Sequence, residues 1–282
     1  MKHIPARIAA TLCAAAAALC TAAAMPASAI NSVHPHTEQT QEATEFGFNF
    51  SHSLYWLQYH NPQDMLWNET VRAGLVLGQG YVSQNISGTQ QGAALTGSAA
   101  WARKLAYSYY GEYTVFTEQP VGGNIGQYLD ISNMKQGDQV VAHRNGVTTT
   151  FFVTGVVPET GKVYCSELSG GRVKWNIEFT RTETAMTRTD NGRTYFLDYF
   201  IRPVKEGDVN GDSVVNFSDF ATLDMSTHTS QNLFPGADYN VLMGVADLDG
   251  DWQITSADVW EIYQNCCDER MNGDYRYVTV YH

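Results

Sequence analysis

The chain has 282 residues, of which 44% are hydrophobic, and a formal net charge of −12. This length accommodates one medium domain and a smaller one. The acid is concentrated near the C-terminus, where residues 206–269 contain 13 Asp/Glu and no Lys/Arg. Such a segment repels a phosphate backbone, so we expect no nucleic-acid partner.

Residues 1–29 have the pattern of a secretion signal. Lys2 and Arg7 precede an apolar run from residue 8 to residue 25, and Ala27-Ser28-Ala29 is an A-x-A cleavage site. No second long apolar run follows, so we expect a secreted, extracellular protein with no membrane anchor. Residues 30–44 are polar and lack periodicity, which indicates a disordered leader.

Residues 45–202 contain a helical pattern followed by strand patterns. The spacing of Ala100, Trp101, Leu105 and Tyr109 predicts a helix over 97–110 that ends at a glycine, with Arg103 and Lys104 facing outward. The β-branched and alternating runs that follow predict strands over 139–143, 148–157, 162–168, 173–179 and 194–201.

Two of the expected turns have a clear chemical signature. Asn145-Gly146 joins the first two strands, and this dipeptide favours a two-residue hairpin. Gly170-Gly171 joins the next pair. A helix followed by an antiparallel sheet predicts an α+β domain over 45–202. We expect residues 203–205 to be a linker, 206–270 a small module, and 271–282 a tail.

Two acidic loops carry the strongest signal for function. The loops 208–219 and 247–258 are 12 residues long, and each has side-chain oxygens at positions 1, 3, 5, 9 and 12. Ca²⁺ takes six to eight oxygen ligands, and this spacing wraps a chain around one ion, with position 7 giving its backbone carbonyl. The expected ligands of two ions are Asp208, Asn210, Asp212, Val214, Asn216 and Asp219, and Asp247, Asp249, Asp251, Gln253, Thr255 and Asp258.

Position 6 of such loops is usually glycine, but here it is Ser213 or Trp252. A non-glycine residue in the left-handed conformation costs on the order of 1 kcal/mol, so we expect weaker binding, more so in the second loop. Apolar runs after each loop predict a following helix.

The phrase Gly207-Asp-Val-Asn-Gly-Asp-Ser-Val-Val-Asn, with Asp219 and the second Asp-x-Asp-Gly-Asp loop, resembles a dockerin over residues 206–270. The resemblance implies a small all-α calcium module that docks to a cohesin domain of a scaffold protein, as in a cellulosome. It also implies that the residues before position 12 select the partner, here Phe217-Ser218 and Ser256-Ala257. Because these pairs differ, we expect docking through one surface.

A second resemblance concerns residues 75–180. The run Gly97-Ser98-Ala-Ala-Trp101, the turn Lys135-Gln-Gly137-Asp138, and the strand Thr149-Thr-Phe-Phe-Val-Thr-Gly155 resemble papain-like amidases or peptidases of the CHAP type. The resemblance implies a papain-like fold with a cysteine at the start of the helix, a histidine heading a strand, and an orienting residue on the next strand. Ser98 (or Ala99, if the register slips by one), Thr149 and Glu167 stand at these positions, so the cysteine and the histidine are missing.

These departures predict a non-catalytic, ligand-binding domain. His143 lies across the Asn145-Gly146 turn from Thr148–Thr150 and is a candidate for a displaced base, although a surface histidine is the simpler interpretation. The expected ligand is cell-wall or plant polysaccharide, or a peptide. The aromatic residues that either line a cleft or belong to the core are Trp101, Tyr107, Tyr109, Tyr110, Tyr113 and Trp175.

The sequence therefore predicts a secreted, dockerin-bearing component of a cellulosome-like complex. The alternative is an active secreted hydrolase, either a cell-wall amidase or peptidase or a polysaccharide-degrading enzyme with a non-standard active site.

Outside the signal, the cysteines are Cys165, Cys266 and Cys267, an odd number that does not indicate a disulfide framework. We expect a buried thiol at Cys165.

Overall fold

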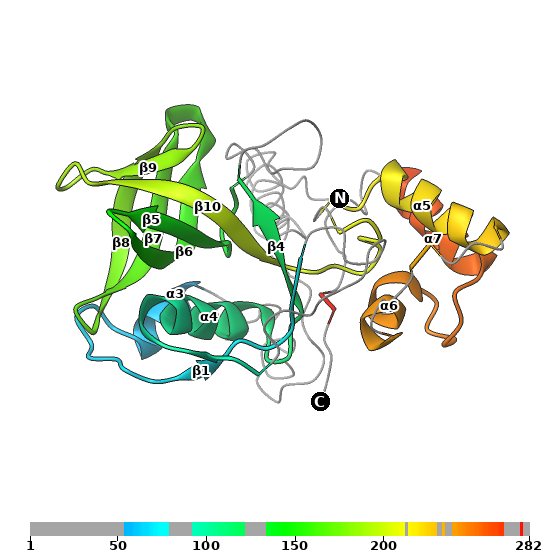
Figure 1. Ribbon diagram of the computed structural model, residues 1–282, viewed down its shortest axis with the longest axis horizontal. Helices are drawn as coiled ribbons and strands as arrows, with labels where there is room; N and C mark the ends of the chain where they lie inside the picture. Colours follow the sequence, from blue (N-terminus) through cyan, green and yellow to red (C-terminus); the bar gives the residue numbers. More distant parts are fainter. Residues whose placement is uncertain are drawn as a thin grey trace, which may run out of the picture.

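The computed structural model describes residues 54–78, 92–121, 134–211, 214–229, 233–234, 239–267 and 277–278. The expected signal segment, the leader and most of the expected tail lie outside these residues. Figure 1 shows the strands gathered on one side of the molecule and the C-terminal helices on the other.

The described elements follow one another in this order: α3 (Leu54–His60), β1 (Val71–Arg72), β2 (Val76–Leu77), β3 (Ala94–Leu95), α4 (Gly97–Tyr110), β4 (Phe116–Pro120), β5 (Gln139–Arg144), β6 (Val147–Val157), a 3₁₀ turn (Pro158–Thr160), β7 (Lys162–Ser169), β8 (Arg172–Arg181), β9 (Ala185–Arg188), β10 (Thr194–Pro203), α5 (Phe217–His228), α6 (Tyr239–Ala246) and α7 (Ser256–Cys267). The helix predicted over 97–110 is confirmed, and so are the helices after the acidic loops and the five predicted strands, within one or two residues at their ends.

The strands from β5 to β10 form a closed barrel. The order β10-β5-β6-β7-β8-β9 returns to β10, which pairs with β9 through Thr194–Phe196, and all these pairs are antiparallel. β4 pairs with the far end of β10, and β2 lies parallel to β4. Closure leaves the barrel strands without an open edge.

The fold class that the sequence predicts, an α+β papain-like domain with a small all-α dockerin, is therefore wrong. The described chain is mostly a closed antiparallel barrel of six strands with few helices. The cause of the error is β9, which has only four residues and no alternating run. Without β9 the sequence predicts an open sheet, whereas the β9–β10 pairing closes it.

Glycine chemistry sets the two predicted hairpins. Asn145 and Gly146 both have positive φ, 51° and 77°, as a two-residue turn between twisted strands requires. Gly170 and Gly171 also have positive φ, 58° and 74°. These turns place His143 opposite Thr148 and Glu167 opposite Lys174.

Helix α4 packs against the outer face of the barrel. Trp101 is fully buried, stands edge-on to Trp67 and Trp175, and donates its indole N–H to the Ser166 hydroxyl at 3.0 Å. Arg103, predicted to face outward, is also buried. Its guanidinium donates to Gln139 Oε1 at 2.9 Å and lies over the Phe116 ring, and burial lowers its pKa to about 10.

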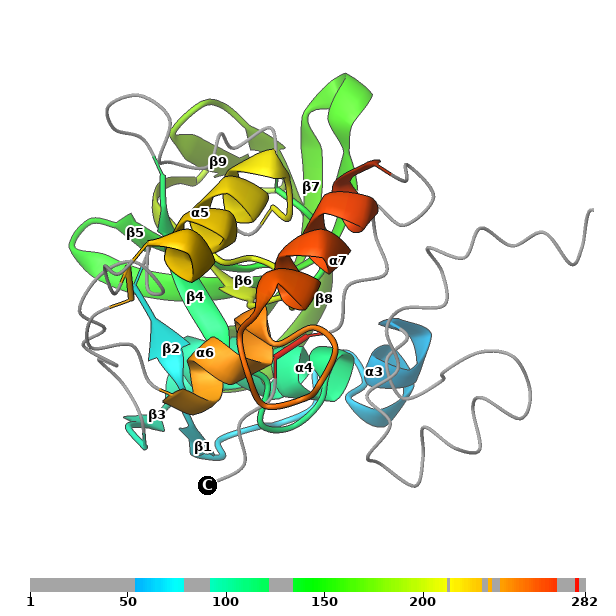
Figure 2. The ribbon, with the colours of Figure 1, turned by 90° about the vertical axis from the view of Figure 1, so that its right-hand side faces the viewer.

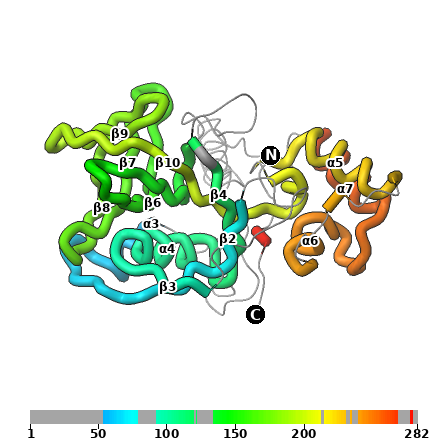
Figure 3. The backbone as a smooth tube through the Cα atoms, in the orientation of Figure 1, coloured from blue at the N-terminus to red at the C-terminus, as the bar shows by residue number. Residues whose placement is uncertain are grey.

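The C-terminal helices have no core of their own among the described residues, because they share one buried cluster with residues in or beside β2, β4 and β10. Figure 2 shows α5 and α7 side by side, with α6 beneath them. In Figure 3 the chain passes from the end of β10 directly into this helical part. The shared cluster contains Leu75, Leu77, Val115 and Val204 together with Val209, Leu223, Phe234, Val241, Val245, Ala246, Val259 and Ile262.

A buried ion pair fastens β10 to the turn before β5. Arg202 donates to Asp138 through Nε at 2.7 Å and through a terminal nitrogen at 2.6 Å, and both residues are buried. The second carboxylate oxygen of Asp138 also accepts the Lys135 N–H at 2.7 Å. Such a pair is costly to break, because the remaining charge stays buried without its partner.

We predict that Asp138→Ala lowers the free energy of unfolding by about 3 kcal/mol, since it removes the carboxylate that accepts two bonds from the buried Arg202 guanidinium. Urea denaturation followed by circular dichroism measures the change. Asp190→Ala is the control, because the Asp190 side chain is 59% exposed and its partner Arg188 keeps its pair with Glu167, so the midpoint should stay close to that of the unaltered chain. Equal midpoints for the two variants would contradict the assigned role.

Candidate metal centre

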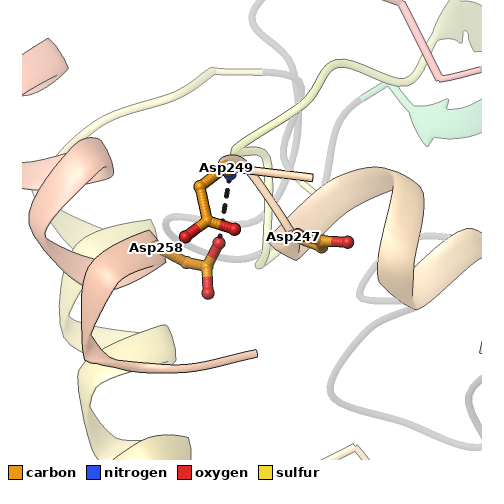
Figure 4. A group of neighbouring side chains, drawn as sticks. All are labelled: Asp247, Asp249 and Asp258. Atoms are coloured by element: carbon orange, nitrogen blue, oxygen red, sulfur yellow. Dashed lines mark hydrogen bonds between the residues drawn. The ribbon is translucent and has the colours of Figure 1, made fainter. Parts of the chain in front are cut away.

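Three carboxylates converge at the second acidic loop. Asp247, Asp249 and Asp258 each offer one oxygen, and these oxygens all lie within 4.8 Å of one another. Figure 4 shows the three side chains beside the start of α7, with the bond from the Asp249 N–H to Asp258 dashed. Clustered carboxylate oxygens suit a hard cation, so this group could hold a metal ion.

Backbone N–H groups fix the first ligand position of this loop. Asp247 accepts the N–H groups of Gly250 at 2.9 Å and Asp251 at 3.1 Å on one oxygen, and that of Trp252 at 2.9 Å on the other. The chain therefore curls around the Asp247 carboxylate. This curl needs Trp252 in the left-handed conformation, with φ 65°.

Position 12 accepts the N–H groups of positions 3 and 9 in both loops. Asp258 accepts the N–H of Asp249 at 3.4 Å and that of Thr255 at 2.7 Å, and it also accepts the N–H of Leu248, at position 2, at 2.8 Å. In the first loop, Asp219 accepts the N–H groups of positions 3 and 9 at 3.0 and 2.9 Å. The repeated sequence spacing therefore folds into a repeated hydrogen-bond pattern.

Position 9 begins the helix that follows each loop. Asn216 Oδ1 accepts the Ser218 N–H at 2.7 Å, and Asn216 and Asp219 form a capping box at the start of α5. Thr255 Oγ1 accepts the Ala257 N–H at 3.1 Å in the same relation to α7. Val214 and Gln253, whose backbone carbonyls are the expected ligands at position 7, are exposed. Asp212 and Ser213 lie outside the described residues.

The two loops differ in their exposure to solvent. At position 12 both Asp219 and Asp258 are fully buried, but at position 1 Asp208 is fully buried and Asp247 only partly so, and Asp249 and Asp251 of the second loop are exposed. A bond from the Asp251 N–H lowers the pKa of Asp249, but desolvation and the nearby carboxylates of Asp258, Asp251 and Asp247 outweigh it and raise that pKa. Mutual repulsion of this kind is relieved by a bound cation.

The positions expected for a nucleophile and its base meet, but without the required chemistry. Ser98 lies in the first turn of α4, and its hydroxyl accepts the Thr150 N–H at 3.2 Å, next to Thr149. Neither Thr149 nor Thr150 has a side chain that accepts a proton near neutral pH. The geometry therefore brings the two segments together as expected and offers no general base at these positions.

Glu167, which the CHAP-type resemblance places as an orienting residue, contacts a different strand. Its carboxylate pairs with Arg188 of β9 and is nearly fully buried. Side chains alternate along β7, so the neighbouring Ser166 is the one that faces α4, where it bonds Trp101. The Glu167 carboxylate therefore lies on the face of β7 opposite to α4.

His143 pairs with Asp198 of β10 rather than with Ser98. Its Nδ1 lies 2.8 Å from Asp198 Oδ1, its ring stacks on Phe196, and its side chain is 46% exposed. This is the surface strand histidine that the simpler interpretation expected. The described contacts of His143 give it no role as a displaced base.

The expected aromatic cleft is mostly core. Trp101, Tyr109, Tyr110 and Trp175 are buried in one cluster, and Tyr107 is partly buried against it, so among these candidates only Tyr113 is exposed.

The prediction that Cys165 is a buried thiol is confirmed, and burial raises its pKa well above the usual value. A thiol with a raised pKa is a poor nucleophile.

An exposed aromatic group crosses α5 and α7, and the sequence predicted only one of its members. Phe217 lies 6.2 Å from Tyr263, Phe220 lies 5.4 Å from Tyr263, and Trp260 stacks on Tyr263 at 5.2 Å (ring centroids). Phe217 and Trp260 are more than half exposed. We name Phe217, Phe220, Trp260 and Tyr263 the aromatic surface. The i, i+3 spacing in each helix is the signal that would have found it.

Comparison with protein-family models, with curated proteins and with solved structures finds no match to this chain. Among the described helices, none is long and apolar enough to cross a membrane.

We predict that Trp252→Gly is more stable than Trp252→Ala by about 1 kcal/mol, because alanine keeps the Cβ atom that disfavours the left-handed conformation and glycine does not. Urea denaturation of both variants at one fixed Ca²⁺ concentration measures the difference. The indole is 69% exposed, so both variants lose little packing and form a matched pair. Equal stability would show that the backbone at Trp252 is unstrained.

Proposed function

We propose that the chain is a secreted, calcium-dependent docking protein. In this proposal the loops 208–219 and 247–258 each bind one Ca²⁺, and the helices that follow them present the aromatic surface to a cohesin domain of a scaffold protein. The single observation that carries it is the repeated hydrogen-bond pattern of the two loops around Asp219 and Asp258.

The donor chemistry supports calcium rather than a softer metal. The ligand positions are filled by carboxylate, amide, hydroxyl and carbonyl oxygens, and neither loop contains cysteine or histidine. Soft or borderline ions such as Zn²⁺ prefer sulfur and imidazole ligands, whereas Ca²⁺ takes oxygens only. Mg²⁺ needs a smaller and more regular octahedron, which a 12-residue loop fits less well.

The aromatic surface supports docking through one face. Phe217 and Ser218, the expected partner-selecting pair of the first loop, are exposed at the start of α5, and Phe217 joins Tyr263 of α7. Ser256 and Ala257 are also exposed but contribute no large apolar side chain. Exposed aromatic residues are typical anchors of protein interfaces. We therefore assign partner binding mainly to Phe217, Trp260 and Tyr263.

The alternative of an active hydrolase has less support. A serine nucleophile needs a base within hydrogen-bond reach, and the hydroxyl of Ser98 meets the Thr150 N–H instead. We assign ligand binding to the barrel, which the docking helices would attach to the scaffold protein. Its ligand, whether cell-wall or plant polysaccharide or a peptide, stays a prediction from the sequence.

We predict that the full chain binds two Ca²⁺ ions and that Asp249→Ala binds one, because Asp249 supplies an exposed carboxylate to the second loop alone. Isothermal titration calorimetry after chelator treatment measures the stoichiometry. Asp224→Ala is the matched control, since this acid lies on α5 beside His228 and outside both loops. A chain that takes up no Ca²⁺ at millimolar concentration would refute the proposed function.

We predict that Phe217→Ala and Trp260→Ala each weaken cohesin binding by about tenfold or more, since truncating a central aromatic anchor costs about 1–2 kcal/mol or more. Surface plasmon resonance against a panel of cohesin domains, with Ca²⁺ and then with chelator, measures the affinities. Tyr239→Ala is the control, because Tyr239 is exposed on α6 and does not belong to the aromatic surface. If the Tyr239 variant loses as much affinity, docking uses another face.

A further inference from the structure

We propose that the first acidic loop is a calcium-controlled joint between the barrel and the docking helices. Ion binding there would order β4 and the end of β10 as well as α5, so that the chain docks as one rigid body. The inference rests on the proposed function, because the first loop must bind Ca²⁺ for the joint to respond to it. The inference is argued from residues 204–211 and their partners in β2 and β4 and beside these strands. We call the barrel together with β2 and β4 the barrel part.

Position 2 of the loop is an apolar residue buried against the barrel part. Val209 is fully buried, and its cluster includes Leu75, Leu77 and Val115, which come from segments around β2 and β4. An apolar side chain that fills a packed core holds its backbone in place. The loop is thus anchored between two ligand positions, Asp208 and Asn210.

Position 4 of the loop is bonded directly to the sheet. Gln119 of β4 donates its amide to the Gly211 carbonyl at 2.6 Å, and Gln119 itself is buried. In the sheet, Gln119 lies opposite Phe200 of β10. A buried carbonyl that loses such a donor has no water to replace it, so this bond is costly to break.

Backbone bonds lock the same region from both sides. Val204 donates its N–H to the Val115 carbonyl at 2.8 Å, and Val278 donates to the Val204 carbonyl at 2.9 Å. Gly207 donates to the Val245 carbonyl of α6 at 2.7 Å. The segment that leads into the loop is therefore bonded to the strand side and to the helix side within four residues.

The second loop is anchored to the strands less directly. Leu248, at its position 2, is only partly buried against the cluster that contains the fully buried Val209. The side-chain hydrogen bonds described for Asp247, Asp249, Asp251 and Thr255 join residues of that loop to one another, and Asp249 and Asp251 are exposed. An ion there would order the start of α7. An ion in the first loop would also fix the Gly211 carbonyl, because Gly211 lies between two ligand positions. Coupling of this kind is reciprocal, so the bond from Gln119 should strengthen Ca²⁺ binding.

Hydrogen–deuterium exchange of the unaltered full chain, with Ca²⁺ and with chelator, tests the joint without any substitution. Chelation should speed exchange by about tenfold or more in residues 116–120 and 199–204, as well as in α5. If α5 loses protection while residues 116–120 and 199–204 keep theirs, the joint is wrong and the docking function stands. If chelation changes exchange nowhere, the proposed function fails as well.

A substitution tests the coupling from the barrel side. Gln119→Leu removes the donor to Gly211 and should weaken one of the two Ca²⁺ sites by about tenfold, leaving the other unchanged. Gln136→Leu is the matched control, because Gln136 donates to the Tyr109 hydroxyl at 2.9 Å, away from both loops. Calorimetry measures both affinities. Two unchanged sites in Gln119→Leu would overturn the joint, and so would equal losses in the two variants.

Discussion

The structure depends on β10, because this one strand pairs with three others. Its first residues pair with β9 and close the barrel, its middle pairs with β5, and its last residues pair with β4. A register shift between Leu197 and Tyr199 lets the strand bend from the barrel wall toward β4. The buried pair of Arg202 and Asp138 then holds its end. The first acidic loop begins at Asp208, after only four residues beyond the end of β10, so the course of β10 also limits where the loop lies.

The parts of the fold that were predictable are local. Turn chemistry at Asn145-Gly146 and the 3.6-residue periodicity of α4 are written in neighbouring residues, and both appear as expected. Closure was not predictable, because it needs a four-residue strand to meet β10, and a short strand has no pattern of its own. Arg103 was misplaced for a similar reason: its partners Gln139 and Ala73 are distant in sequence, and they make a buried guanidinium tolerable.

The candidate site divides in the same way. Oxygen side chains at fixed spacing reveal both loops, since the ligands of one ion come from one short segment. Nothing in that spacing tells that Asp208 is fully buried while Asp247, at the same position of the second loop, is only partly buried, because burial depends on packing between segments distant in sequence. The i, i+3 spacing of Trp260 and Tyr263 is visible in the sequence, but their contact with Phe217 and Phe220 forms only where α7 lies beside α5.

In the proposed function, the residues that contact the partner lie between residues that bind the ion, so ion binding and partner binding depend on the same turn. Phe217 and Ser218 lie between Asn216 and Asp219, and these two residues also form the capping box that starts α5. A helix of 12 residues is marginal in isolation, so its first turn depends on such a cap and on packing. An ion held by positions 9 and 12 would fix the turn that carries Phe217. Phe217 would then be ordered before the partner binds. The entropy cost of binding would be smaller, and the affinity higher.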